Sequence, residues 1–270
     1  KAQDALAQTE LESAEKELAV SKAAYALLVA KYEQDRKLRS IIIPEEYAKH
    51  DMTDYQWFLN NAERFMALQP KEVTYWSEAI GKNAEKVDIA NMTDAQRREI
   101  AEFVVQMMND IQKQYWSHRD PSKVFTPIKL TDEAQTLAKK ITDEYSKRYA
   151  ENGGTPDKFK FQNNWGHFTD ILRSYKVGES LGGLLPTWHA EEMGGYTMLA
   201  LKYDIARDIR RMMFDDGSQA NGHAKHLISA QGTGVSLSSG TLNIINIPKS
   251  TMDTSKQVST YANTDEDAYN

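Results

Sequence analysis

The sequence contains no cysteine, and this absence excludes several kinds of chemistry. A chain without thiols forms no disulfide bonds, uses no thiol nucleophile and holds no zinc site built on thiolates. The absence of cysteine does not identify the cellular compartment, because a secreted protein does not need cysteine.

The chain also lacks an excess of positive charge: 33 lysines and arginines stand against 39 aspartates and glutamates, a formal net charge of −6. Phosphate binding requires a clustered positive surface, so this balance disfavours nucleic acid as a partner. No stretch approaches the roughly 20 apolar residues of a membrane span. The first residues are not those expected of a signal peptide.

Signatures of common enzyme classes are missing as well. There is no His-Glu-x-x-His, no Gly-x-Ser-x-Gly and no phosphate-cradling loop. The residues that are present suffice for a folded protein, because 13 tyrosines, 8 phenylalanines and 5 tryptophans argue against disorder. A length of 270 residues exceeds the usual single domain, so we expect one domain and an extension.

Residues 1–40 carry one uninterrupted helical pattern and predict a coiled-coil stalk segment. The a/d seam has alternating spacings of three and four, at Leu11, Ala14, Leu18, Ser21, Tyr25, Leu28 and Tyr32. Lys1 lies inside the pattern without an N-cap, so we expect this helix to continue a longer coiled coil. The partner is either another part of the same chain or a second copy, which would give a homodimer. The alternative is an amphipathic helix packed on its own domain.

Residues 41–91 predict a helical collar that joins the stalk to a head. Thr53-Asp54-Tyr55 starts an amphipathic helix that ends before Pro70. A second short helix is expected from Val73 to Ala79. The aromatic residues of the collar are expected to pack in a core, and the alternative is a binding surface.

Residues 92–249 predict a head domain with helices first and antiparallel strands last. Thr93 and Gln96 form a capping box at the start of one helix, and further helices are expected after Thr131, His167 and Thr197.

The strand signals of the head are short. Residues 124–130 predict an extended edge segment, limited by Pro127. Alternation from Gly234 to Ile247, with a turn at Ser239-Gly240, predicts a hairpin. The whole order predicts an α+β fold built as α-β-α layers. Residues 250–270 are expected to be a linker or a return to the stalk.

Two glycine-flanked segments carry the residues that are candidates for catalysis or metal binding. Glu179 lies in Gly-Glu-Ser and His223 follows Gly222, where a sharp turn of the backbone is expected to leave each side chain exposed at a cleft edge. His167, after Trp165-Gly166, adds a second imidazole, although by itself it is more typical of a helix start. Two imidazoles and a carboxylate can bind a divalent cation or carry out acid–base chemistry.

Other candidates near these segments give weaker signals. His226 lies three residues after His223 and can share a metal with it, but a solvent-facing ring is the favoured interpretation. Asp204 and Asp208 lie one helical turn apart on the helix after Thr197. Asp215-Asp216, beside Gly217, is interpreted as a solvated turn.

The order of these pieces resembles the CAP superfamily of cysteine-rich secretory, antigen 5 and pathogenesis-related 1 proteins, over about residues 92–248. Phe214-Asp215-Asp216, Gly222-His223-Ala224 and Gly234-Val235 look like the PrgA-type surface exclusion proteins of Gram-positive conjugative plasmids. The resemblance implies a CAP-like α-β-α sandwich with two histidines and two acidic residues in a central cleft. Some members bind zinc or another divalent cation there.

Carried onto this chain, the resemblance implies His167, Glu179 and His223 as cleft residues, with His167 and His223 as metal ligands. The fourth position falls on the helix before Gly-His, where Asp208 or Asp204 stands in place of glutamate. Ser180 replaces the usual asparagine, and Ala224 replaces the aromatic residue after Gly-His.

The function implied is a cell-surface exclusion factor that limits conjugative plasmid transfer from donor cells. Such a protein is extracellular, is attached to the cell wall by an anchor outside this segment, and meets a donor-cell surface protein such as an adhesin. One alternative is a protease, in which His167 or His223 acts as general base while Glu179 orients it or helps to hold a metal. Proteolysis can be the means of exclusion or unrelated to conjugation. Another alternative is a non-catalytic adhesive head.

Overall fold

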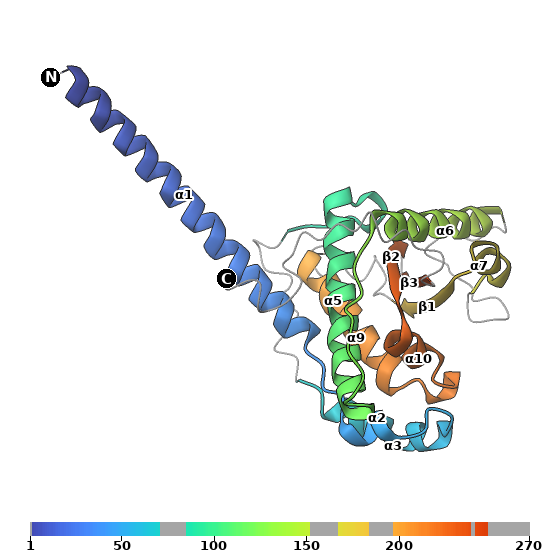
Figure 1. The fold of residues 1–270 in the computed structure, drawn as a ribbon. Coiled ribbons are helices and arrows are strands. Elements are labelled where there is room, and N and C mark those ends of the chain that lie inside the picture. Colours follow the sequence, from blue (N-terminus) through green and yellow to red (C-terminus); the bar gives the residue numbers. More distant parts are fainter. Residues whose placement is uncertain (1, 71–84, 152–166, 184–196, 239–240, 248–270) are drawn as a thin grey trace. The chain divides into compact units, whose positions relative to one another are not determined.

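The computed structural model describes residues 2–70, 85–151, 167–183, 197–238 and 241–247. The chain divides into two compact units, Lys1–Leu38 and Arg39–Asn270. Nearly all of the first unit belongs to one long helix, α1 (Ala2–Arg39), shown in Figure 1. None of the helices in the described residues is long and apolar enough to cross a membrane.

The predicted seam of α1 is exposed. Leu11, Leu18, Tyr25 and Leu28 each keep more than half of their surface accessible to solvent. Exposed apolar side chains at this spacing are what a coiled-coil partner would cover. The pairing itself stays a prediction.

The second unit contains helices before, between and after the strands. The α-helices are α2 (Glu45–Lys49), α3 (Tyr55–Ala67), α5 (Asp94–Arg119), α6 (Asp132–Glu151), α7 (Thr169–Tyr175), α9 (Met198–Phe214) and α10 (Gly222–Ser229). The short 3-10 helices are η1 (Ile89–Asn91) and η3 (Gly217–Gln219). The strands are β1 (Gly178–Gly183), β2 (Gly232–Ser238) and β3 (Thr241–Ile247), and they form an antiparallel sheet in the order β1-β3-β2.

The sheet lies between two helical layers. Alternate residues of each strand face opposite sides of the sheet, so each face contacts a different layer. Glu179, Ile245 and Gly234 are aligned across the three strands and face the layer that contains α6. The intervening positions Gly178 and Gly182 of β1 face α10 and α9 instead. This arrangement confirms the predicted α+β fold with an α-β-α sandwich and a long N-terminal helix (Figure 1).

Helix starts follow the capping signals of the sequence. Gln96 donates its backbone N–H to Thr93 Oγ1 at 3.2 Å, and Gln96 Oε1 accepts from the Thr93 backbone at 3.0 Å, which confirms the capping box. Thr197 caps α9 through its hydroxyl. The predicted hairpin is confirmed as β2 and β3. The helix expected from Val73 to Ala79 lies outside the described residues.

The edge segment predicted at residues 124–130 does not become a strand. Asn109 of α5 donates from Nδ2 to the Ile128 carbonyl at 3.0 Å and accepts the Ile128 N–H at 2.7 Å. One side-chain amide thus supplies both partners that a neighbouring strand would have offered to this residue. The third strand of the sheet is β1, which the sequence had indicated as a turn.

Aromatic side chains of the collar region pack in the core of the second unit, as expected. Tyr47, Phe58 and Phe65 are buried, and the Tyr47 ring lies edge-on to Phe214 of α9 with centroids 5.2 Å apart. The Tyr47 hydroxyl donates to the Met213 carbonyl, so the buried phenol has a partner.

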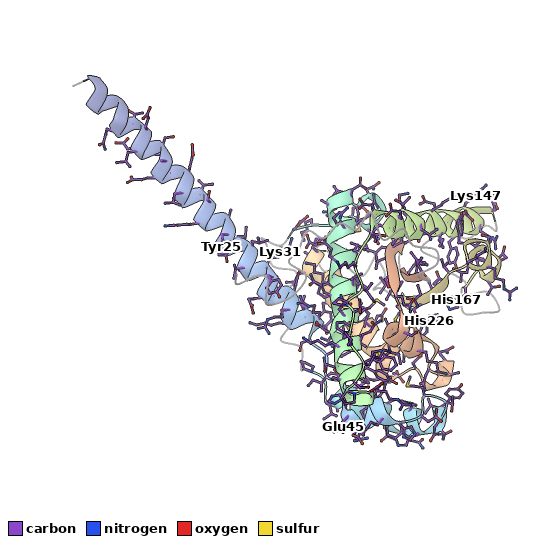
Figure 2. All side chains as sticks on the ribbon, viewed as in Figure 1. Tyr25, Lys31, Glu45, Lys147, His167 and His226 are labelled. Carbon is purple, nitrogen blue, oxygen red and sulfur yellow. The ribbon has the colours of Figure 1, made fainter. Side chains whose placement is uncertain are left out.

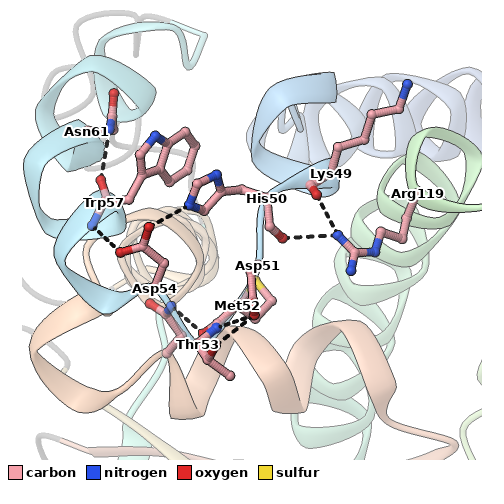
Figure 3. Close-up of polar contacts among 10 residues, drawn as sticks. Lys49, His50, Asp51, Met52, Thr53, Asp54, Trp57, Asn61 and Arg119 are labelled. Carbon is pink, nitrogen blue, oxygen red and sulfur yellow. Dashed lines mark hydrogen bonds and ion pairs between the residues drawn. The ribbon is translucent and has the colours of Figure 1, made fainter.

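Polar contacts fix the turn between α2 and α3 (Figure 3). Arg119 at the end of α5 donates from Nη1 to the carbonyls of Lys49 and His50, at 2.6 and 3.0 Å. The His50 ring stacks on Trp57, with centroids 3.7 Å apart, and its Nε2 lies 3.0 Å from Asp54 Oδ2. These contacts satisfy carbonyls at the end of α2 and hold α3 against it.

The packing of α6 on β2 depends on the absence of a side chain at Gly234. A Cβ added there would lie 2.1 Å from the Ala134 carbonyl oxygen and 2.9 Å from Ala138 Cβ. We expect Gly234→Ala to lower the free energy of unfolding by about 1–3 kcal/mol, because backbone of α6 has to move. Gly183→Ala is the matched control, since nothing lies within 4 Å of its Cβ position. Urea denaturation of both variants measures the difference, and equal stabilities would contradict this account of the packing.

Candidate functional site

The carboxylate of Glu179 is buried and fully hydrogen-bonded at the edge strand β1. Oε2 accepts from the Tyr145 hydroxyl at 2.8 Å and lies 2.8 Å from His167 Nδ1. Oε1 accepts from Asn243 Nδ2 at 2.8 Å. Its side chain is 0% exposed, so the expectation that Glu179 lies exposed at a cleft edge is wrong. Burial follows from its place inside a strand that faces α6 rather than in a turn.

Glu179 and α6 together position His167. A carboxylate oxygen accepts, so the hydrogen-bond network assigns the ring hydrogen to Nδ1 and leaves Nε2 as the basic atom. The Tyr145 hydroxyl also accepts the Phe168 N–H at 3.1 Å, and the two rings meet edge-on at 4.7 Å. The chain on the C-terminal side of His167 is therefore fixed, and 25% of the His167 side chain reaches solvent.

A second histidine–carboxylate pair joins His223 to Asp216. Asp216 Oδ1 lies 2.7 Å from His223 Nδ1, while Oδ2 accepts the backbone N–H groups of His223 at 2.8 Å and Ala224 at 3.1 Å. The Asp216 side chain is 2% exposed and that of His223 is 22% exposed. The interpretation of Asp216 as part of a solvated turn is wrong. The sequence gives no direct signal for this contact, because five residues separate Asp216 from Gly222 and only the loop between them brings the carboxylate to the helix N-terminus.

Two left-handed residues bring Asp216 back to the start of α10. Ala220 and Asn221 have φ values of 56° and 53°, and the Asn221 N–H donates to the Asp216 carbonyl at 3.0 Å. Asn221 Nδ2 also donates to the Met52 carbonyl at 3.0 Å, which ties this loop to the segment before α3. Alanine rarely adopts a positive φ, so the loop is held in a strained shape.

A third imidazole, His226, lies between these two pairs. Its Cε1 is 3.3 Å from the position that a Gly178 Cβ would occupy, and its Nδ1 is 3.2 Å from Ser180 Oγ. Burial lowers the pKa of His226, and the neighbouring His223 and His167 lower it further. The solvent-facing ring expected from the sequence is therefore wrong, because α10 turns His226 onto the sheet. Figure 2 labels His226 and His167 beside the strands.

Asp208 is placed against β1 of the sheet, at Gly182. A Cβ at Gly182 would lie 2.7 Å from Asp208 Oδ2, which has no hydrogen-bond partner among the described residues. Burial raises the pKa of Asp208 to about 7, and Asp204 adds to this, while Arg207 and Arg211 act in the opposite direction. The role inferred for Asp208 as fourth cleft residue stays a prediction.

Metal binding at this site also stays a prediction. In the described ranges, no three histidine, aspartate or glutamate side chains converge as a metal centre requires. Glu179 already accepts from Tyr145 and Asn243 and pairs with His167, which leaves little of its coordination capacity for zinc.

The chain has a layered α+β fold with a long preceding helix, and this fold is found in a protein of known structure. A solved structure described as the CAP domain of Enterococcal PrgA has this fold. The similarity has a TM-score of 0.52 at 16% sequence identity and covers 79% of this chain and 92% of that chain. No family model and no curated protein matches the sequence. At this identity the similarity shows the fold alone.

The raised pKa of Asp208 predicts a measurable pH dependence of stability. Between the usual aspartate pKa of 3.8 and about 7, the folded chain holds a proton on Asp208 that the unfolded chain has released. This contribution to stability is therefore full below pH 3.8 and is lost as the pH rises to about 7, on the order of 1 kcal/mol per pH unit. Asp208→Asn should remove this slope, so its stability relative to the parent should rise across the window.

The exposed Asp215 at the end of the same helix provides the control. Asp215→Asn should keep the pH profile of the parent. Urea denaturation of the three proteins at several pH values measures the slopes, and identical slopes for Asp208→Asn and the parent would refute the assignment.

Proposed function

We propose that this chain is part of a bacterial cell-surface protein that limits conjugative plasmid transfer from donor cells. The observation that carries the proposal is the fold shared with the CAP domain of Enterococcal PrgA across most of both chains. The ordered segments around Glu179, His223 and Gly234 support the same conclusion. In this proposal the protein is extracellular, with a wall anchor outside this segment, and α1 belongs to a stalk.

The proposed contact with the donor cell is made at the edge of the sheet beside β1. His167 and His223 each use Nδ1 on a buried carboxylate and each keep part of the ring exposed. Histidine rings held in this way present an apolar face and a basic Nε2 to a partner without losing much side-chain entropy on binding. A donor-cell protein such as an adhesin is the proposed partner.

Recipients that produce the full-length protein should accept plasmids from donors less often than recipients that lack it. The double variant His167→Ala/His223→Ala should return transfer to the level of recipients without the protein, because both partly exposed rings are removed. His118→Ala, in the last turn of α5, is the matched control and should exclude donors as the parent does. Transfer frequency is measured at equal surface levels of each protein. A parent that does not reduce transfer at all would overturn the proposal.

Hydrolysis is the second candidate function, and the histidine–carboxylate pairs favour it. A carboxylate on Nδ1 stabilises the imidazolium that forms when Nε2 takes a proton from water. Ser180 is a poor nucleophile for such a reaction, since it is fully buried beneath His226. Attack by an activated water molecule is therefore the form of hydrolysis that we consider.

If the head cleaves a donor adhesin, His223→Ala should reduce the rate of cleavage by about 100-fold or more, as expected for loss of a general base. Purified parent and variant are incubated with the adhesin, and fragments are quantified over time. Exclusion by the parent without any detectable fragment would leave exclusion intact as a function and remove proteolysis as its means.

A further inference from the structure

We infer that Asp216 is the positioning residue of His223: its carboxylate holds the hydrogen of the ring on Nδ1 and leaves Nε2 as the atom that meets a ligand. This deepens the proposed function, on which it rests for the use made of Nε2. Asp216 precedes His223 by seven residues and belongs to the loop between α9 and α10.

The two oxygens of Asp216 have different tasks. Oδ2 accepts two backbone N–H groups, from His223 and Ala224, in the first turn of α10, where N–H groups have no partner within the helix. Oδ1 is then left for the ring and lies 2.7 Å from Nδ1. Because both donors of the helix end are satisfied by one oxygen, the second oxygen is not needed for capping.

An asparagine at this position would fill the space but reverse the ring contact. Its single oxygen would accept the two backbone N–H groups, as Oδ2 does now, because the NH2 group of an amide donates and does not accept. Its NH2 group would then face Nδ1, which has to become an acceptor, and the ring hydrogen would move to Nε2. Asparagine caps helices about as well as aspartate, so helix α10 itself is expected to persist.

The other two histidines of the site give an internal comparison. His167 has the same arrangement as His223, with Nδ1 on the buried carboxylate of Glu179. His226 differs, because its Nδ1 faces the hydroxyl of Ser180, which can donate or accept, and not a carboxylate. A spectrum that resolves the three rings thus contains two whose Nδ1 meets a carboxylate, His167 and His223, and one whose Nδ1 meets a hydroxyl, His226.

The test is nitrogen NMR of the full chain with labelled histidine, recorded well above the usual histidine pKa of about 6.5 so that neutral rings report their tautomer. The parent should show His223 and His167 with hydrogen on Nδ1. Asp216→Asn should change the ratio of the two His223 tautomers towards Nε2–H by about tenfold or more, equivalent to about 1.4 kcal/mol. His167 should stay unchanged in the same spectrum.

Two controls separate positioning from general disturbance. Asp215→Asn changes the neighbouring residue, whose exposed carboxylate lies 4.0 Å from Arg211 Nε, and should leave all three rings as in the parent. Glu179→Gln should shift His167 and leave His223 unchanged. An unchanged His223 in Asp216→Asn would overturn the inference. A parent with His223 as Nε2–H would do so without any variant.

The spectrum reports the ring whether or not the protein excludes donors. A chain with His223 as Nδ1–H that fails to reduce plasmid transfer contradicts the proposed function and leaves the role of Asp216 standing. A chain that reduces plasmid transfer but has His223 as Nε2–H supports the proposed function and contradicts the role of Asp216.

Discussion

The His167 part of the site depends on one interaction, the buried and hydrogen-bonded carboxylate of Glu179. A charged group without solvent is stable only when its oxygens are hydrogen-bonded, and the partners of Glu179 come from three different parts of the chain. Tyr145 comes from α6, His167 from the segment before α7, and Asn243 from the central strand β3. Each of these parts is thus held at β1 by the same requirement. One buried carboxylate therefore joins α6, the segment before α7 and the sheet.

The glycines of β1 let the opposite face of the strand carry different chemistry. Gly178 leaves room for the His226 ring and Gly182 for Asp208, while Glu179 between them faces α6. A Cβ at Gly182 would lie 2.7 Å from Asp208 Oδ2, so that carboxylate would have to move, whereas a Cβ at Gly178 would lie 3.3 Å from the His226 ring and requires only a small shift. An edge strand with alternating small residues can therefore carry the Glu179 carboxylate on one face and accept the His226 ring on the other, at the adjacent position Gly178.

The helices, the capping box and the hairpin follow from local sequence, because their periodicity and caps act within a few residues. Strand β1 does not, since a Gly-Glu-Ser-Leu-Gly-Gly segment has low intrinsic strand propensity and pairs only because β3 offers a partner. Of the residues in the two histidine–carboxylate pairs, the glycine and helix-start contexts indicate His167, Glu179 and His223 as candidates. Their partners Tyr145, Asn243 and Asp216 were missed because each contact is made by tertiary packing or by a strained loop, which no spacing rule reveals.

Asp208 and Asp216 show how differently the fold surrounds two buried carboxylates that lie close in sequence. Both side chains are buried, but Asp216 accepts three N–H hydrogen bonds, whereas Oδ2 of Asp208 has no partner among the described residues. Burial then raises the pKa of Asp208 to about 7, so this group is easily neutralised. A carboxylate serves as the ionic partner of an imidazole only where donors offset the loss of water. The first turn of α10 supplies those donors to Asp216, and the body of α9, whose own N–H groups are already bonded, cannot supply them to Asp208.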